Sequence, residues 1–235
     1  MSTRLETVEV EPGTAADATV VLMHGLGADG HDFEPVASEL RLGPARAVRW
    51  VFPHAPVRAV TINGGSRMRA WYDILGFDRH AAEDEDGIRE SAAGVRALVE
   101  REKQRGIAAD RIVLAGFSQG GAIALYTALR EPERLAGVIA LSTYVPLASK
   151  LEAESHPANA AVPIFMGHGQ WDDIVPLALG ERSRDALRSR GHDVEWHTYP
   201  MPHSVCPEEI AQMRDWLMRV LPAYSPRSVR LASSQ

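Results

Sequence analysis

The sequence predicts an α/β protein, with a mostly parallel central sheet that helices cover on both faces. Two observations lead to this prediction. Short apolar runs that end in glycine or proline have the composition of strands buried on both faces. Between these runs lie stretches with apolar residues at helical spacing, and the alternation of strands and helices is typical of a parallel sheet. The length of 235 residues suits one domain of this class.

The expected strands share a core of consecutive apolar residues, apart from the last one, which alternates. An alternating pattern indicates a strand at the edge of the sheet or with one exposed face. The expected strands are 19–25, 48–56, 111–116, 137–142, 162–169 and 192–200.

Four segments carry helical signals: 84–105, 119–130, 177–190 and 207–221. The first has apolar residues at helical spacing and acidic residues in its first turn, where they interact favourably with the helix dipole. The last begins with Pro207, a residue favoured at the first helical position, followed by two glutamates.

No repeat or low-complexity linker divides the chain, so we expect a single domain over residues 1–222. The tail, 223–235, has no apolar periodicity and is expected to be loose. The segment 60–77 interrupts the alternation because it is long, broken by glycines and rich in large apolar residues. A connection of this length in a compact domain is usually functional.

Composition narrows the class of function. The formal net charge of −6 argues against a nucleic acid or an anionic membrane surface as the main partner. The only cysteine is Cys206, so the chain cannot form an internal disulfide. We expect no signal peptide and no membrane span, and therefore a cytoplasmic protein. A homodimer is compatible with the sequence.

The strongest chemical signal is Gly116-Phe117-Ser118-Gln119-Gly120, at the point where an apolar strand gives way to a helix. A sharp strand-to-helix turn strains its middle residue, and side chains two positions away would collide. Glycines at 116 and 120 remove those side chains, so the hydroxyl can project above the sheet. Ser118 is therefore a candidate nucleophile.

A serine nucleophile needs a histidine base, and five histidines follow Ser118: His156, His168, His192, His197 and His203. The first four lie in strand patterns, beside Gly169 or in a polar stretch, where structural roles are more common. His203 lies in a proline-flanked loop between the last strand and the last helix, at the carboxyl edge of the sheet. We therefore prefer His203 as the base.

The base needs an acid to orient it, and this acid should follow the strand 162–169. Asp172 and Asp173 are adjacent there, and neighbours in a turn point in different directions. We choose Asp172, although the residues alone leave Asp173 as an alternative.

An acyl-transfer site also needs two backbone N–H groups for the oxyanion. The residue after the nucleophile, Gln119, should supply one. The glycine-rich loop "MHGLGADG" (23–30) is the candidate for the other, because its glycines allow a tight fold with amides turned inward.

These motifs together resemble the carboxylesterase/lysophospholipase/acyl-protein thioesterase family of α/β hydrolases, and most closely its bacterial carboxylesterases. The resemblance is carried by "LMHGLGADGHDF", "RAWYDI", "GFSQGGA", "HGQWDDIVP" and "HSVCPEE", in the family's order, from about residue 20 to 220.

The resemblance implies an α/β-hydrolase fold with Ser118 as nucleophile, Asp172 as acid and His203 as base. It selects Asp172 because the family's acid follows His-Gly after two residues. It also implies Leu26 and Gln119 as the oxyanion donors.

The resemblance further implies that 60–77 covers the substrate, with Trp71 facing the acyl pocket. Leu75 adds apolar surface to that wall. The alternative for Trp71 is that it anchors the loop to the core.

We expect a serine carboxylesterase acting on small acyl esters or thioesters of short to medium chain length, without cofactor or metal. A main activity as acyl-protein thioesterase or lysophospholipase is the alternative. A non-catalytic binding protein on the same scaffold is disfavoured because no member of the triad is missing. No His-x-x-x-His or clustered Cys/His set favours a metal-dependent hydrolase, and Cys206 is expected to be a packing residue.

Overall fold

The central feature is a seven-stranded sheet in the order β1-β3-β2-β6-β7-β8-β9. The computed structural model describes residues 4–40, 42–43, 46–76 and 82–223. Every neighbouring pair in the sheet is parallel except β1 and β3. The strands are β1 (Thr7–Val10), β2 (Ala18–Met23), β3 (Val48–Pro53), β6 (Ile112–Phe117), β7 (Gly137–Leu141), β8 (Ile164–Gly169) and β9 (Val194–Tyr199).

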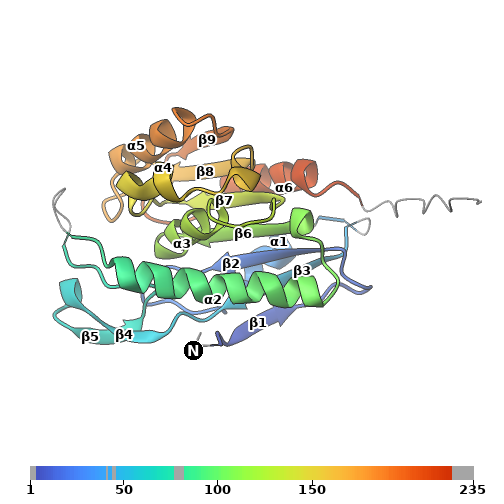
Figure 1. Cartoon of the computed structure of the whole chain (residues 1–235), viewed down its shortest axis with the longest axis horizontal. Helices are drawn as coiled ribbons and strands as arrows, with labels where there is room; N and C mark the ends of the chain where they lie inside the picture. The colour runs from blue at the N-terminus through green and yellow to red at the C-terminus, as the bar shows by residue number, and fades with distance from the viewer. Residues whose placement is uncertain (1–3, 41, 44–45, 77–81, 224–235) are drawn as a thin grey trace, which may run out of the picture.

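Helices cover both faces of this sheet (Figure 1). The α-helices are α1 (Glu34–Leu40), α2 (Glu85–Gln104), α3 (Gln119–Ala128), α4 (Leu151–Glu154), α5 (Leu177–Arg188) and α6 (Pro207–Val220). Short 3-10 turns are η1 (Thr61–Asn63), η2 (Ala109–Arg111), η3 (Ala148–Lys150) and η4 (Pro157–Asn159). The mostly parallel sheet with helices on both faces confirms the predicted fold class.

The sheet separates two hydrophobic cores. Along β2, Ala18, Val20 and Leu22 face the core shared with α1 and α6, whereas Val21 and Met23 face the core shared with α2 and α3. Both sets are buried, which explains why β2 has an uninterrupted apolar sequence. All six predicted strands and all four predicted helices are confirmed, with ends shifted by a few residues.

The alternating strand β9 lies at the edge of the sheet, as its pattern predicts. β1, at the other edge, has no counterpart in the sequence analysis. It has only four residues, all half-buried, and its position depends on antiparallel pairing with β3, about 40 residues further along the chain.

The segment 60–77 is partly regular. β4 (Val57–Val60) and β5 (Ser66–Arg69) form an antiparallel hairpin that carries η1 at its turn. The hairpin residues are mostly exposed or half-buried, so no apolar run indicates these strands. Residues 77–81 and the predicted loose tail, except for Ala223, lie outside the described residues.

Among the described residues, no helix combines the length and the hydropathy of a membrane-spanning segment.

A buried carboxylate joins α2 to the sheet at the amino ends of the strands. Glu102 is fully buried and accepts hydrogen bonds from Thr19 Oγ1 at 3.0 Å and Arg49 Nη1 at 2.9 Å. Glu102 also accepts hydrogen bonds from Arg101 Nε and Arg105 Nη1, both at 3.1 Å. These donors replace the water that a buried charge loses.

Replacing Glu102 with Ala should lower the free energy of unfolding by about 3 kcal/mol, because Arg49 and Thr19 then lose a buried acceptor. The control is Glu100→Ala, since Glu100 is exposed and its contact with Lys103 is a surface ion pair worth under about 1 kcal/mol. Urea unfolding measures both. Equal, small changes in the two variants would contradict a structural role for the buried carboxylate.

Candidate active site

Three of the predicted site residues lie at the same edge of the sheet. Ser118 follows β6, Asp172 lies three residues after β8, and His203 lies four residues after β9. Because these strands are parallel, their carboxyl ends meet at one edge, where α/β proteins bind ligands.

Ser118 occupies a strained turn between β6 and α3. Its φ of 55° and ψ of −122° lie outside the regions that non-glycine residues favour. A Cβ on Gly116 would lie 2.2 Å from the carbonyl carbon of Gly120, and a Cβ on Gly120 would lie 2.3 Å from the carbonyl oxygen of Met23. The prediction that both glycines make room for the turn is confirmed.

The neighbouring strand holds the backbone of this turn. The Ser118 N–H donates to the Leu141 carbonyl at 2.9 Å. The Ser118 carbonyl accepts from Thr143 Oγ1 at 2.6 Å. Thr143 is buried just after β7, and its part in the turn was missed, since a lone threonine after a strand carries no distinctive signal.

Asp172 and His203 are in direct contact. His203 Nδ1 lies 2.7 Å from Asp172 Oδ2. The other oxygen, Oδ1, accepts the backbone N–H groups of Ile174 at 3.0 Å and Val175 at 2.8 Å. The Asp172 side chain is fully buried, whereas Asp173 is exposed. Only Asp172, of the two adjacent aspartates, is hydrogen-bonded to His203.

The loops that carry Asp172 and His203 are held together by their backbones. Gln170 N–H donates to the Tyr199 carbonyl at 2.8 Å, and Trp171 N–H donates to the Met201 carbonyl at 3.1 Å. A Cβ on Gly169 would lie 2.4 Å from the Pro202 carbonyl oxygen, so only glycine allows this close approach.

The ring of His203 also packs against the residue before the candidate nucleophile. The centroid of the His203 ring lies 4.6 Å from that of Phe117, and the two ring planes are tilted by 44°. Phe117 in turn packs against Phe33, with their ring planes tilted by 41°. The contact with Phe117 brings His203 beside the turn at Ser118. Among the hydrogen bonds of the described residues, none joins Ser118 Oγ to His203.

The two predicted oxyanion donors lie on either side of this turn. Gln119 opens α3, and Leu26 lies in the loop after β2, where a Cβ on Gly25 would be 3.4 Å from Ser118 Cβ. Within the described part of the chain, no backbone or side-chain acceptor takes the N–H of Leu26 or Gln119.

His24 fixes the start of the loop that contains Leu26. Its Nε2 accepts the Ala55 N–H at 3.0 Å, so the proton must be on Nδ1, which donates to the Gly25 carbonyl at 2.6 Å. Burial lowers the pKa of His24 and favours this neutral form. His24 carries no distinctive signal in the sequence, because a histidine in a glycine-rich loop has many possible roles.

The position of Trp71 corrects the expectation that it faces an acyl pocket. Its exposed fraction is 0%, so it offers no surface to a ligand in this structure. Its Nε1–H donates to the His24 carbonyl at 2.9 Å, and its backbone N–H donates to Gln119 Oε1 at 3.1 Å. Trp71 anchors its segment to the loop after β2 and to α3, in agreement with the alternative from the sequence.

Gln119 Nε2 completes this connection by donating to the Tyr72 carbonyl at 2.9 Å. The buried side chain of Gln119 thus binds the backbone of 71–72 from both its oxygen and its nitrogen. The sequence motif pointed only to the backbone of Gln119, so this role of the side chain was missed.

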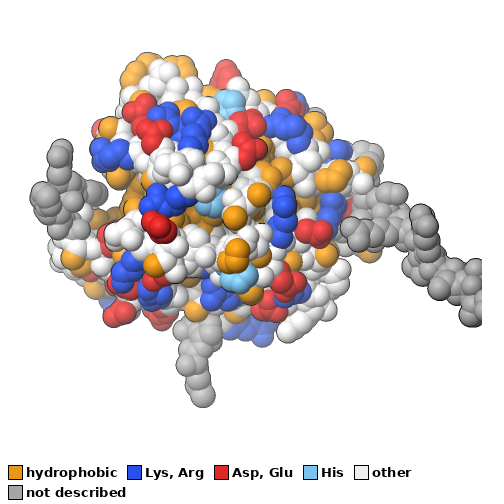
Figure 2. All heavy atoms as spheres, turned by 45° about the horizontal axis from the view of Figure 1, so that its top comes forward, with side chains coloured by type: hydrophobic (Ala, Val, Ile, Leu, Met, Phe, Trp, Pro, Cys, Tyr) orange, Lys and Arg blue, Asp and Glu red, His pale blue; other side chains and the backbone are white. Residues whose placement is uncertain are grey.

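Apolar side chains are exposed on the loops near this edge. Leu75 is 44% exposed, and Trp171 and Ile174, which flank Asp172 in the sequence, are 66% and 54% exposed. Figure 2 shows one face of the molecule, on which hydrophobic side chains lie between charged ones of both signs. Trp171 and Ile174 thus expose apolar surface within two residues of Asp172.

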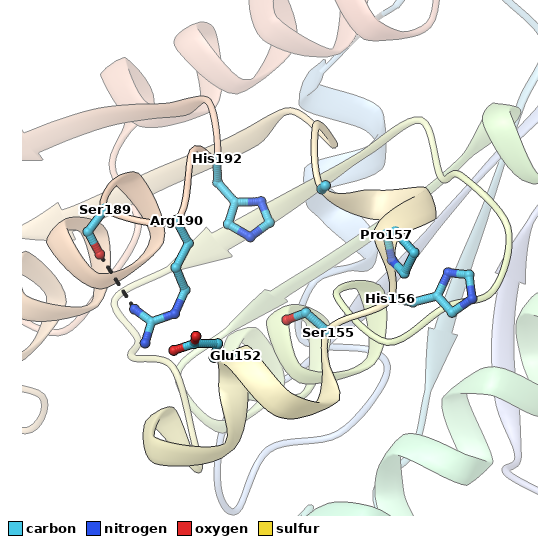
Figure 3. A pocket seen from close by; sticks show the side chains of 8 residues that line it. Glu152, Ser155, His156, Pro157, Ser189, Arg190 and His192 are labelled. Atoms are coloured by element: carbon cyan, nitrogen blue, oxygen red, sulfur yellow. Dashed lines mark hydrogen bonds between the residues drawn. The ribbon is translucent and has the colours of Figure 1, made fainter.

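A separate cavity of about 540 Å³ lies at the opposite end of the strands. Figure 3 shows side chains from α4, η4 and the segment after α5 around it. Its lining residues are Glu152, Ser155, His156, Pro157, Ala160, Ser189, Arg190 and His192. These segments precede β8 and β9, whereas Asp172 and His203 follow them, so the cavity is distinct from the candidate active site.

The chain is similar over nearly its whole length to proteins of known name. The chain is 40% identical over 238 residues to acyl-protein thioesterase 1 of Cryptococcus neoformans var. neoformans serotype D, covering 94% of this chain and 100% of that protein. It is 42% identical over 221 residues to acyl-protein thioesterase 1 of Neurospora crassa, covering 90% of each.

A solved structure, that of acyl-protein thioesterase 2 from Zea mays, superposes with a TM-score of 0.81 at 32% identity, covering 92% of this chain and 99% of that one. The family model described as Phospholipase/Carboxylesterase matches residues 5–221. These matches confirm the resemblance seen in the motifs: the chain belongs to the phospholipase/carboxylesterase family of α/β hydrolases.

Proposed function

We propose that this protein is a serine hydrolase that cleaves carboxylic esters and thioesters through an acyl-enzyme intermediate. The observation that carries the proposal is the 2.7 Å contact between His203 Nδ1 and the buried Asp172 Oδ2, beside the strained turn at Ser118. A histidine oriented by a buried carboxylate is the arrangement that activates a serine hydroxyl.

In this mechanism Ser118 Oγ attacks the acyl carbonyl carbon while its proton moves to His203 Nε2. Asp172 keeps the His203 Nδ1–H in place and stabilises the positive charge that forms on the ring. The tetrahedral intermediate collapses as His203 gives the proton to the leaving alcohol or thiol. Water, deprotonated by His203, then attacks the acyl-enzyme and releases the acid and Ser118.

The oxyanion of the intermediate would bind the N–H groups of Leu26 and Gln119. Their lack of acceptors among the described residues supports this assignment. Each such donor is worth about 3–4 kcal/mol of transition-state stabilisation. The mechanism also requires Ser118 Oγ to reach His203 Nε2 in the substrate complex, and such contacts often tighten only on binding.

For the substrate, acyl-protein thioesterase activity is the second candidate. The observation that favours it is the 40–42% identity, over nearly the whole chain, to proteins named acyl-protein thioesterase 1. Hydrolysis rates for p-nitrophenyl esters, S-acyl thioesters and an S-acylated peptide, measured side by side, distinguish the two. A kcat/KM at least tenfold higher for the S-acylated peptide than for any simple ester would favour the thioesterase.

Replacing Ser118 with Ala should reduce kcat by roughly 10⁴- to 10⁶-fold, because the nucleophile is lost, and leave the melting temperature nearly unchanged. A fluorophosphonate probe followed by peptide mass spectrometry should label Ser118. Ser204→Ala, in the His203 loop, is the control and should retain turnover. Labelling at Ser142 or Ser204 instead would refute the assignment.

Replacing Asp172 with Asn should lower kcat by about 10³- to 10⁴-fold, because the amide cannot hold the same tautomer of His203. Asp173→Asn is the matched control, since Asp173 is adjacent but exposed, and should change kcat by less than about threefold. Steady-state kinetics of both variants test the assignment. A larger loss in Asp173→Asn would mean that the wrong aspartate has been assigned.

We also propose that Leu75 contributes to the wall that receives the acyl chain. An apolar wall gains about 0.8 kcal/mol per buried methylene, so kcat/KM should rise roughly fourfold per added carbon until the wall is filled. Leu75→Ala should flatten this rise for butyrate to octanoate esters and leave acetate unchanged. An equal loss for all chain lengths, acetate included, would show that Leu75 does not contact the acyl chain.

A further inference from the structure

A buried histidine, distinct from His203, packs against the loop that carries Asp172. His168, near the end of β8, has an exposed fraction of 0%. Its Nε2 lies 2.8 Å from the carbonyl oxygen of Val175. A carbonyl can only accept a hydrogen bond, so the His168 proton must be on Nε2.

The same nitrogen also faces the carboxylate of Asp172. His168 Nε2 lies 3.5 Å from Asp172 Oδ2, the oxygen that contacts His203 Nδ1. Val175, whose carbonyl accepts from His168, donates its own N–H to Asp172 Oδ1 at 2.8 Å. His168 therefore lies close to both sides of the carboxylate: Nε2 is near one oxygen, and its N–H holds Val175, the residue that binds the other oxygen.

Packing leaves the His168 ring little freedom. A Cβ on Gly180 of α5 would lie 2.5 Å from His168 Nδ1, and the Trp196 ring of β9 lies 5.9 Å away between centroids. Nδ1 has no hydrogen-bond partner among the described residues. No acceptor there calls for a proton on Nδ1, which agrees with the proton being on Nε2. Burial lowers the pKa of His168, which favours the neutral ring.

We propose that His168 is a positioning residue for the hydrolytic reaction: its Nε2–H holds the 172–175 turn and aligns the Asp172 carboxylate with His203. This inference rests on the proposed function, in which Asp172 orients the base. It assigns His168 no contact with substrate. A purely structural His168 would fill the core between β8 and α5 and leave the alignment of Asp172 unaffected.

The test compares variants that keep or remove the donor. In His168→Gln the side-chain amide can place an N–H near the original Nε2, whereas His168→Leu and His168→Asn cannot supply it there. Both of the latter should lower kcat about 10- to 100-fold with KM nearly unchanged, since a small displacement of the acid misaligns the base. His168→Gln should restore most of kcat.

The control is His192→Leu. His192 is also buried, and its pKa is likewise lowered by burial, but it lies before β9 at the other end of the strands. Its loss should leave kcat unchanged even if it lowers stability. The control thus separates the loss of any buried imidazole from the loss of the contact with Asp172.

A double-mutant cycle with Asp172→Asn tests whether His168 acts through Asp172. In the Asp172→Asn background, His168→Leu should lower kcat by less than about twofold, because the carboxylate it aligns is already absent. Multiplicative losses would overturn the proposal. So would a wild-type kcat in His168→Leu, or a failure of a folded His168→Gln to recover activity.

Proton NMR gives a second test that does not depend on catalytic turnover. The low-field proton resonance of His203 Nδ1–H should shift or broaden in His168→Asn and be retained in His168→Gln and His192→Leu. An unchanged resonance in His168→Asn would overturn the proposal. If the wild-type protein hydrolyses no ester or thioester, the proposed function fails, while this resonance still reports on the contact between His168 and Asp172.

Discussion

The candidate site depends on how closely the first turn of α3 approaches the end of β2. Gly120 lies so near the Met23 carbonyl that any side chain would collide with it. This approach places the N–H of Gln119, which has no acceptor among the described residues, beside the loop that contains Leu26, and it leaves Ser118 in its strained conformation. Trp71 then joins the same two segments through its ring and its backbone. The strain is sustained because these surrounding contacts oppose its relaxation.

The other half of the site is organised around a buried charge. Asp172 is removed from water, and its carboxylate is met by His203 and by the N–H groups of Ile174 and Val175. Such donors offset the free-energy cost of removing the carboxylate from water, and they also fix its orientation. The proposed role of His168 extends this arrangement by one residue, since it holds Val175 from the opposite side. A site built this way needs little reorganisation when charge develops on the base.

The sequence predicts the fold, and it suggests the candidate site residues, because the signals of both are local. A glycine-flanked serine after an apolar strand, an aspartate after the next-to-last strand and a histidine in a proline-flanked loop are each visible within about ten residues. What it could not predict depends on contacts between distant segments. Trp71 in a long apolar segment suits a pocket wall as well as an anchor, and only its bonds to His24 and Gln119 decide between them. The strand β1 was missed for the same reason, because its pairing partner lies far along the chain.

In the proposed mechanism, Ser118, His203 and the N–H groups of Leu26 and Gln119 act on one carbonyl group. A crystal structure of the protein inhibited at Ser118 by an alkyl phosphonate tests it most directly, because the phosphonyl group resembles the tetrahedral intermediate. We expect a phosphonyl oxygen within about 2.7–3.1 Å of the N–H nitrogens of both Leu26 and Gln119. We also expect His203 Nε2 to face Ser118 Oγ while Nδ1 stays hydrogen-bonded to Asp172. A phosphonyl oxygen directed away from both amides, or a His203 ring turned away from Ser118, would contradict the proposed mechanism.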